Sequence, residues 1–398
     1  MEKLFQRFTT KIRSVSNEFH RYLYDQINWN DRLIVIKGAR GVGKTTLLLQ
    51  YIKEHLELNE KTLYASLDDI YFQANTLVDL AAEFHMNGGQ FLFLDEVHKY
   101  PNWSMEIKNI YDTYSDLKVV FTSSSVLEIY KGDADLSRRA VTYELEGFSF
   151  REYVNLETGH EFQAVDLAAI IENHKELAGA ITEKVKVFPL FHKYIVSGYY
   201  PFYREGEDSY VTRLTNVVNL ILETDIPSAF KTEYKTIYKL KKLLYIISTA
   251  IPYQPNVTQL SKSIDTTSRT STLQYLDYLE KAKLTANLKT GAKGKNILIK
   301  PDKVYLENTN LMYAIGDTET NSGNIRETFF FNQLREKHRV STSKFGDFLV
   351  DHTYTFEVGG KGKKLTQIQG VKDGYVVADN IEVGLGKKIP LWLFGFLY

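Results

Sequence analysis

Residues 38–45, GARGVGKT, match the phosphate-loop pattern G-x-x-x-x-G-K-[ST] at every fixed position. A β-branched run, LIVIK, precedes them and a helical pattern, TTLLLQYIKEHLE, follows, as the motif requires. Glycines let backbone N–H groups close around phosphate oxygens, and the helix N-terminus adds positive potential. The lysine would reach the β- and γ-phosphates of ATP, and the last hydroxyl would ligate Mg²⁺. The expected nucleotide-binding residues are Gly38, Ala39, Arg40, Gly41, Val42, Gly43, Lys44, Thr45 and Thr46.

Two acidic residues, Asp95 and Glu96, follow the apolar run FLFL at 91–94. Such a run predicts a buried strand, and ligands of open α/β sheets bind at the carboxyl ends of the strands. We therefore expect Asp95 and Thr45 to hold Mg²⁺, Asp95 mostly through water. Glu96 is expected to orient and deprotonate the attacking water. The alternative, a solvated strand end without a function, is disfavoured by the phosphate loop upstream.

Hydroxyl side chains end a second apolar run, VVFTSSS at 119–125. A polar group at this place can sense the γ-phosphate or position water, and we assign that role to Ser123 or Ser124. The alternative is a serine–threonine turn or a helix N-cap, and Ser125 is expected to be such a cap. His98 is expected to be a hydrogen-bonded structural residue, with a catalytic role as the alternative.

An arginine pair, Arg138 and Arg139, precedes the last strand predicted for this part of the chain. An arginine in that location can stabilise the charge of the transition state, either in cis or across a contact between subunits. A contact of the second kind would require a homo-oligomer. The alternative is a surface pair that takes no part in the reaction.

The elements that must position these groups are indicated by alternating patterns between residues 30 and 146. Short apolar runs predict five strands, with helical patterns between them: 32–37, 62–67, 90–94, 117–122 and 141–145. Strands that alternate with helices are typical of a parallel sheet covered on both faces. The predicted fold class is α/β, with a P-loop parallel-sheet ATPase core at 1–146. Residues 147–228 have mostly helical patterns and are expected to form a helical lid.

Several segments resemble the AAA+-type predicted ATPases of bacteria and archaea that carry a conserved C-terminal region of unknown function. The segments are GARGVGKTTLL, FLFLDEVHKY, FTSSSVLEIY, LSRRAVTYELEGFSFREYV, SGYYPFY, ETDIP and DFLVDHTYTFEVGGKGK. The resemblance covers nearly the whole chain, and LEGFSFREY is similar to the segment that follows the ATPase core in that family. It implies ATP chemistry but supplies no further substrate.

A basic region lies within a chain whose 49 Lys and Arg balance its 49 Asp and Glu. Residues 231–300 contain 13 Lys and Arg against 4 Asp and Glu, a charge of +9. Across 229–320 we expect two helices joined by a polar turn and then strands at 284–288 and 296–299. This order is typical of a winged-helix domain.

Double-stranded DNA is the partner that the charge of this region favours, because each phosphate contact would release counterions. The expected contacts are at the start of the recognition helix and on the wing: Ser268, Arg269, Thr270, Lys289, Lys293 and Lys295. The alternative is that the winged helix docks proteins and binds no nucleic acid, as many winged helices do.

The tail, 321–398, resembles a restriction-endonuclease-like domain, an α+β fold. Such nucleases need an acid and a lysine two residues apart on one strand, near a further Asp. Here Asp347 and Glu357 are present, but position 359 is Gly359, and Lys361 would lie about 7 Å further along a strand. We therefore expect a degraded nuclease-like domain that does not cut DNA. The closing apolar run, PLWLFGFLY at 390–398, is expected to be a buried last strand.

The composition of the 398 residues agrees with a globular protein, since 43% are hydrophobic and 25% are charged. The absence of cysteine excludes disulfides, thiol nucleophiles and thiolate zinc sites. No signal peptide is visible and no apolar run approaches the ~18 residues of a membrane span. The expectation is a cytoplasmic, DNA-associated ATPase in which Mg²⁺-dependent hydrolysis drives conformational change. The alternative is a nucleotide-dependent switch whose winged helix binds protein partners.

Overall fold

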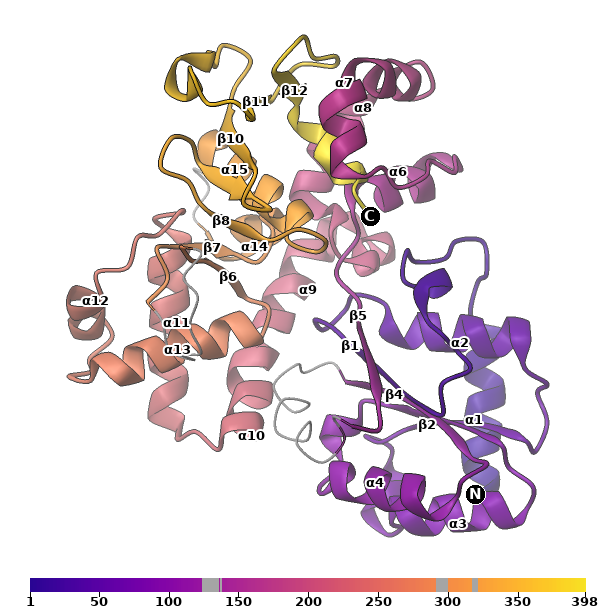
Figure 1. The fold of residues 1–398 in the computed structure, drawn as a ribbon. Helices are drawn as coiled ribbons and strands as arrows, with labels where there is room; N and C mark the ends of the chain where they lie inside the picture. The colour runs from indigo at the N-terminus through magenta and orange to yellow at the C-terminus, as the bar shows by residue number, and fades with distance from the viewer. Residues whose placement is uncertain (124–135, 137, 291–299, 317–320) are drawn as a thin grey trace. The chain divides into compact units, whose positions relative to one another are not determined.

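The computed structural model describes the chain except for residues 124–135, 137, 291–299 and 317–320. The chain divides into two compact units, Met1–Gly147 and Phe148–Tyr398. Figure 1 shows the elements of both units along the chain. The four-part division predicted from the sequence is finer than these two units, and its inner boundaries stay a prediction.

The first unit is built on a parallel sheet of five strands with the order β2-β3-β4-β1-β5. The strands are β1 (Leu33–Lys37), β2 (Thr62–Ser66), β3 (Phe91–Asp95), β4 (Lys118–Ser123) and β5 (Val141–Glu144). The predicted α/β class and its parallel sheet are therefore confirmed. One strand, β4, lies between the strand before the phosphate loop and the strand that ends in Asp95, so three carboxyl ends meet at one edge.

Helices cover both faces of this sheet because its strands are apolar on both sides. The helices are α1 (Glu2–Arg13), α2 (Lys44–His55), α3 (Leu77–Met86) and α4 (Trp103–Thr113), with 3₁₀ turns at Tyr24–Gln26, Ile70–Gln73 and Val97–Lys99. Leu33 and Val35 of β1 join a core cluster with residues of α3 and α4. Ile34 and Ile36 alternate with them and are fully buried, as expected for the face that α2 covers (Figure 1).

The second unit begins with helices. They are α6 (Phe150–Thr158), α7 (Leu167–Thr182), α8 (Val187–Lys193), α9 (Glu207–Leu220) and α10 (Ile226–Phe230), with π-helical turns at Tyr194–Gly198 and Ile221–Asp225 and a 3₁₀ turn at Pro201–Glu205. The first of them starts with a capping box, in which Ser149 and Glu152 each accept a hydrogen bond from the other's backbone N–H. Residues 147–228 are therefore mostly helical.

Three helices and a hairpin follow. They are α11 (Tyr234–Ser248), α12 (Val257–Ser263), α13 (Arg269–Lys281), β6 (Thr285–Leu288) and β7 (Lys303–Leu306). The Ser268 side chain caps α13 by accepting from the Ser271 N–H. Tyr253 forms a β-bridge with Val304, beside the hairpin. The strand predicted at 296–299 and the wing residues Lys293 and Lys295 lie outside the described residues, and the strand that pairs with β6 is β7.

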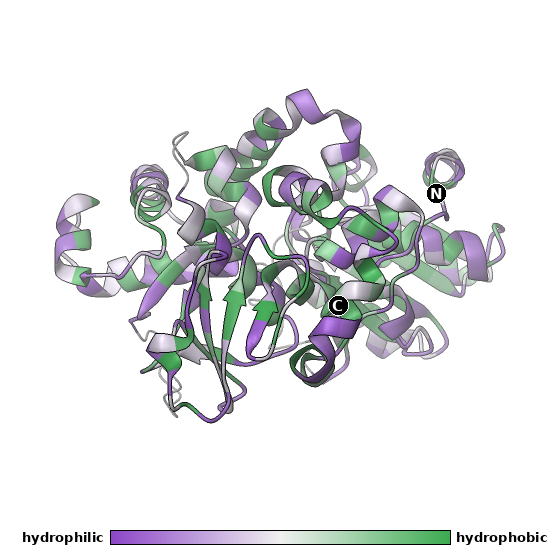
Figure 2. Ribbon diagram, turned by 90° about the horizontal axis from the view of Figure 1, so that it is seen from above, coloured by the Kyte–Doolittle hydropathy of each residue, from purple (hydrophilic) through white to green (hydrophobic). Residues whose placement is uncertain are grey.

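The C-terminal part combines two helices with a mixed sheet of order β12-β11-β10-β9-β8. The elements are α14 (Thr309–Ile315), α15 (Ser322–Leu334), β8 (Val340–Thr342), β9 (Phe348–Val350), β10 (Tyr354–Gly359), β11 (Gly374–Ala378) and β12 (Lys388–Pro390), with a 3₁₀ turn at Leu365–Ile368. In the hydropathy colouring of Figure 2, apolar and polar stretches alternate along the strands and helices of the chain.

The prediction of a last strand at 390–398 is wrong, although its residues are buried. The sheet ends at Pro390, and Leu391–Phe396 form a 3₁₀ helix. Its aromatic rings pack on several sides: the ring centroid of Phe394 lies 4.8 Å from that of Phe330 and 5.6 Å from that of Phe356. A continuous apolar run does not distinguish a buried strand from a buried helical segment, which explains the error.

Among the described residues, no helix is both long enough and apolar enough to cross a lipid bilayer.

Candidate nucleotide-binding site

The backbone of the phosphate loop requires glycine at defined places. Gly41 and Gly43 have φ angles of +84° and +99°, a left-handed conformation that other residues rarely adopt. At Gly38 the constraint is space, because a Cβ would lie 2.2 Å from the carbonyl oxygen of Leu145. The loop therefore closes tightly between β1 and the N-terminus of α2, the place where a phosphate group binds in such loops.

The side chain of Lys44 is held over this loop by backbone carbonyl groups of the loop. Its Nζ donates hydrogen bonds to the carbonyl oxygens of Gly38, at 3.0 Å, and Ala39, at 2.8 Å. The residue is 4% exposed, so its charge is concentrated in a largely desolvated place. An ammonium group in this position suits the oxygens of a polyphosphate.

Asp95 gathers three hydroxyl groups at the carboxyl end of β3. Thr45 Oγ1 and the Tyr64 hydroxyl each donate to Oδ2 at 2.7 Å, and Thr122 donates to Oδ1. Thr45 and Asp95, the predicted Mg²⁺ ligands, are thus brought together. A hydroxyl and a carboxylate are ligands that Mg²⁺ prefers, so the residues fit that ion. Across the described residues, no group of three His, Asp or Glu side chains could hold a metal, and the other ligands would come from phosphates and water.

Tyr64 contacts Asp95, and the sequence analysis did not predict this contact. It lies on β2, and its hydroxyl also accepts a hydrogen bond from Lys11 Nζ of α1, at 2.9 Å. Burial and the neighbouring Asp95 raise the pKa of the Tyr64 hydroxyl far above its ordinary value, so it remains a donor to the carboxylate.

Glu96 follows β3 with a φ angle of +54°, which is a strained conformation for a glutamate. Its Oε2 lies 3.5 Å from Nε2 of His98, whose side chain is 3% exposed against 21% for Glu96. The other ring nitrogen of the histidine, Nδ1, lies 3.2 Å from Ser123 Oγ. Burial lowers the pKa of His98 to about 2, with smaller contributions from the positive charges of Lys99, Arg40 and Lys44. The imidazole is therefore neutral at physiological pH.

The remaining predicted site residues have different surroundings. Ser123 ends β4 in register with Lys37, the residue before the phosphate loop. Ser124 and Ser125 lie outside the described residues. Arg139 donates two hydrogen bonds to the carboxylate of Asp112 on α4, from Nε to Oδ1 at 2.9 Å and from Nη2 to Oδ2 at 3.1 Å. Arg138 is exposed.

Arg21 is a second residue that the sequence analysis missed. It is 6% exposed, although it carries a charge. Its Nη1 donates to the carbonyl oxygen of Val42 in the phosphate loop. Its Nη2 donates to the carbonyl oxygens of Glu146, at 2.8 Å, and Gly147, at 3.0 Å. One guanidinium thus ties the phosphate loop to the end of the first unit.

In the tail, Glu357 forms an ion pair with Lys363, whereas the sequence analysis considered Lys361. The 360–363 turn brings this lysine back towards β10. Burial raises the pKa of Glu357, and the nearby charge of Asp347 adds to that rise. Asp347 Oδ2 accepts a hydrogen bond from the Val358 N–H at 2.8 Å. Lys363 and the backbone therefore pair with one oxygen of each acid, while Glu357 Oε2 is buried without a hydrogen-bond partner in the described part of the chain.

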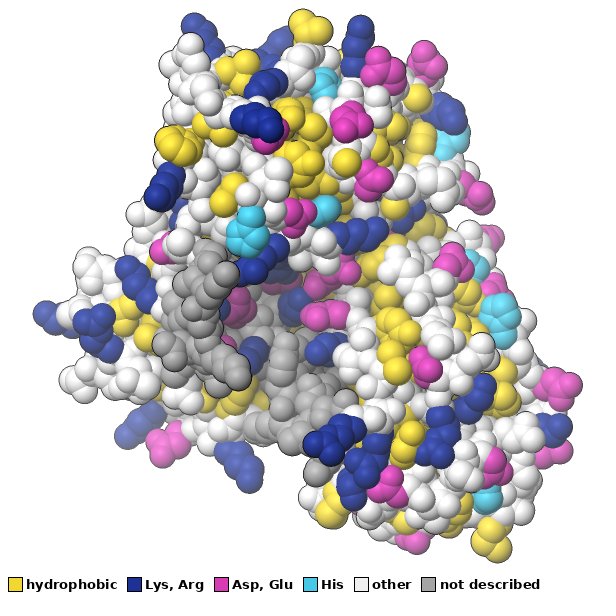
Figure 3. Space-filling model, viewed as in Figure 1, with side chains coloured by type: hydrophobic (Ala, Val, Ile, Leu, Met, Phe, Trp, Pro, Cys, Tyr) yellow, Lys and Arg dark blue, Asp and Glu magenta, His cyan; other side chains and the backbone are white. Residues whose placement is uncertain are grey.

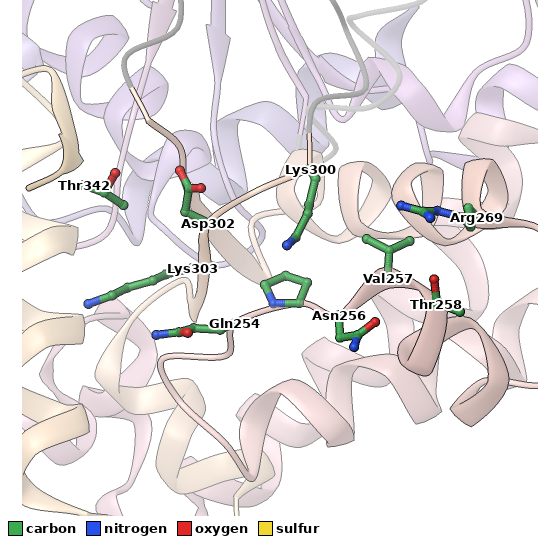
Figure 4. Close-up of a pocket in the computed structure, with 10 residues that line it drawn as sticks. Gln254, Asn256, Val257, Thr258, Arg269, Lys300, Asp302, Lys303 and Thr342 are labelled. Carbon is green, nitrogen blue, oxygen red and sulfur yellow. The ribbon is translucent and has the colours of Figure 1, made fainter. Parts of the chain in front are cut away.

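A basic cavity of about 810 Å³ lies beside the hairpin of the second unit. Its lining includes Arg269 at the start of α13, Lys300, and Lys303 of β7. Lys303 Nζ lies 3.6 Å from Glu327 Oε2, and Figure 4 shows the side chains of Arg269 and Lys300 among those that line the cavity. Figure 3 shows Lys and Arg side chains gathered on the lobe that carries α11 to α13, with fewer acidic groups among them.

Comparison with protein families gives two matches. Residues 30–154 match the model of an AAA domain, AAA_14, and residues 189–322 match a domain of unknown function, DUF8612. The first match contains the phosphate loop, Asp95 and Glu96, and the second contains α11 to α13 and the hairpin. Residues 30–154 are thus similar to an AAA domain, and this AAA-type fold supports a nucleotide-binding ATPase.

Individual relatives are distant. The chain is 26% identical over 298 residues to the uncharacterized protein MJ1637 of Methanocaldococcus jannaschii, covering 71% of this chain but only 62% of that one. It is 23% identical over 356 residues to an uncharacterized protein of Haemophilus influenzae, covering 85% and 83%. Among solved structures, the Walker-type ATPase PABY2304 of Pyrococcus abyssi is 12% identical with a TM-score of 0.42, covering 75% of this chain and 95% of that one.

Proposed function

We propose that this chain is an AAA+-type ATPase that binds ATP with Mg²⁺ at the phosphate loop and hydrolyses it to drive conformational change. The observation that carries the proposal is the 2.7 Å contact between Thr45 and Asp95, two residues 50 positions apart. It joins the first turn after the loop to the end of β3, with Lys44 beside it. Few functions other than nucleotide binding need these three groups together.

Each protein group has a defined task in this proposal. Lys44 binds the β- and γ-phosphates, and the N–H groups of the loop bind the remaining oxygens. Thr45 and Asp95 hold Mg²⁺, which when bound neutralises charge on the β- and γ-phosphate oxygens. Glu96 orients the attacking water and accepts its proton. Ser123 contacts the γ-phosphate side of the site from the end of β4.

Phosphate release from ATP by the purified chain tests this proposal. We expect slow turnover with Mg²⁺ and none when EDTA removes the metal, because the protein alone does not neutralise the phosphate charge. Turnover without a divalent ion would contradict the assignment of Thr45 and Asp95.

The same assay at several protein concentrations tests for a homo-oligomer with Arg138 acting in trans. Turnover per chain should then rise with concentration. Turnover independent of concentration would place the arginine in cis or outside the reaction.

DNA binding by residues 229–320 is the second function that we propose, with these residues acting as a winged-helix domain. Three helices followed by a hairpin support it, as does the Ser268 cap that starts α13 beside the cavity. Arg269 and Lys300 give that cavity the charge to take backbone phosphates. Docking of a protein partner is the alternative, and salt dependence separates the two.

For the full-length chain, we expect affinity for duplex DNA to fall steeply as salt rises, because phosphate contacts release counterions. The double variant Arg269→Ala, Lys300→Ala should reduce the slope of log K against log salt by about 2. Lys364→Ala, another exposed lysine of the second unit, is the control and should leave the slope unchanged. Weak binding that is the same for the wild type and the double variant would favour protein docking.

Repeating the binding reactions with Mg²⁺ or Mn²⁺ tests the tail for nuclease activity. We propose that the duplex stays intact, since Glu357 is already neutralised by Lys363. Cleavage that disappears in Glu357→Ala would overturn the view of a degraded nuclease-like domain.

A further inference from the structure

His98 lies between two groups of the nucleotide site that come from different strands. Nδ1 lies 3.2 Å from Ser123 Oγ at the end of β4, and Nε2 lies 3.5 Å from Glu96 Oε2 after β3. The imidazole is almost fully buried, so these contacts are made away from bulk water. The three side chains form a row that ends at the proposed water-activating carboxylate.

The chemistry of the two neighbours fixes which nitrogen carries the proton. An ionised carboxylate only accepts hydrogen bonds, so Nε2 must carry the hydrogen that faces Glu96. In a neutral ring Nδ1 is then an acceptor, and the Ser123 hydroxyl donates to it. The low pKa that burial gives this ring agrees with a neutral tautomer of this kind. Hydrogen-bond donation therefore runs in one direction: Ser123 donates to the ring, and the ring donates to Glu96.

We propose that His98 is a positioning residue for ATP hydrolysis: its Nε2–H holds the carboxylate of Glu96 in place, while Ser123 fixes the ring through Nδ1. The inference rests on the proposed ATPase function. Glu96 has a left-handed backbone and a side chain that is 21% exposed, and the buried ring lies 3.5 Å from its carboxylate. Ser123 belongs to β4, the strand between β1 and β3, so the ring links the γ-phosphate side of the site to the base.

Variants of the full-length chain separate positioning from packing. In His98→Gln, the side-chain amide can donate to Glu96 from about the place of Nε2. In His98→Asn, the shorter amide can still accept from Ser123 but does not reach Glu96. His98→Ala removes both contacts. For each variant we would measure kcat, KM for ATP, the Kd of a fluorescent ATP analogue, and Tm.

We expect kcat to fall by about 10- to 100-fold in His98→Ala and His98→Asn, because a misplaced group loses orientation but not binding. KM and Kd should stay within about twofold, since the variants leave Lys44 and the rest of the phosphate loop unchanged. His98→Gln should recover most of the loss. In a Glu96→Gln background, His98→Ala should cause little further loss, because the two residues act as a unit.

Three results would overturn the proposal. They are wild-type kcat in His98→Ala, equal losses in the Gln and Asn variants, and losses that are fully additive with Glu96→Gln. If the alanine variant does not fold, the comparison of Gln with Asn decides alone, since both keep an amide in the ring's place. Absence of turnover in the wild type would instead count against the proposed ATPase, and the ring tautomer could then be read from ¹⁵N NMR of histidine. An Nδ1–H tautomer would contradict the assignment.

Discussion

Replacing Lys44 with alanine is expected to abolish ATP binding. The ammonium group is buried above the loop and is held by two carbonyl groups, so it is already oriented towards the phosphates. A hydrogen bond to a charged group contributes about 1.5–3 kcal/mol. Loss of the two bonds proposed from Lys44 to the β- and γ-phosphates should lower the affinity for ATP by about 100-fold or more. Binding of a fluorescent ATP analogue, measured by anisotropy, gives the affinity directly.

Lys53→Ala is the matched control for this variant. Lys53 lies in the last turn of the same helix, where its Nζ donates to the carbonyl oxygen of Val15. We expect wild-type affinity for that variant and a similar Tm for both. If Lys44→Ala binds nucleotide as the wild type does, the phosphate loop is not the binding site.

Replacing Glu96 with glutamine should leave ATP binding intact, in contrast to Lys44→Ala, but should abolish turnover. The amide has nearly the same size as the carboxylate but accepts no proton from water. Removing a general base typically lowers the rate by about 10²- to 10⁴-fold, and that is the fall in kcat that we expect. Phosphate release and the Kd of the analogue should be measured on the same preparation.

Glu83→Gln, an exposed glutamate of α3, controls for the loss of one negative charge in this unit. It should hydrolyse ATP at the wild-type rate. Wild-type turnover in Glu96→Gln would mean that another group activates the water, and the role proposed for His98 would fail with it.

The geometry of the candidate nucleotide site could be anticipated where neighbouring residues in the sequence are also neighbours in space. The phosphate loop is continuous in the chain, and its glycines, lysine and threonine are fixed by local backbone geometry. Asp95 was located by a general rule, since the carboxyl ends of parallel strands share one edge of a sheet. These assignments needed no knowledge of side-chain packing.

Contacts that depend on packing carried no such signal. Tyr64 is one of 27 tyrosines and, within TLYASL, has the appearance of an ordinary strand residue. Arg21 lies before the first strand, and nothing in its spacing relates it to Val42 or Gly147. Lys363 reaches Glu357 only because a turn reverses the chain after β10. In each case the partner is set by the tertiary fold, which a local pattern does not describe.

The order of strands in the first unit also bears on how the protein is made. During synthesis β1 leaves the ribosome first, yet its native neighbours, β4 and β5, are the last two strands of the sheet to emerge. The loop after β1 also packs against Leu145, whose N–H donates a hydrogen bond to the Lys37 carbonyl oxygen at 2.8 Å. A nascent chain therefore carries β1 with both edges unpaired until β4 and β5 emerge, and unpaired strand edges are prone to aggregation. Nucleotide would not protect this nascent chain, because a ligand that binds only the folded unit stabilises only that state.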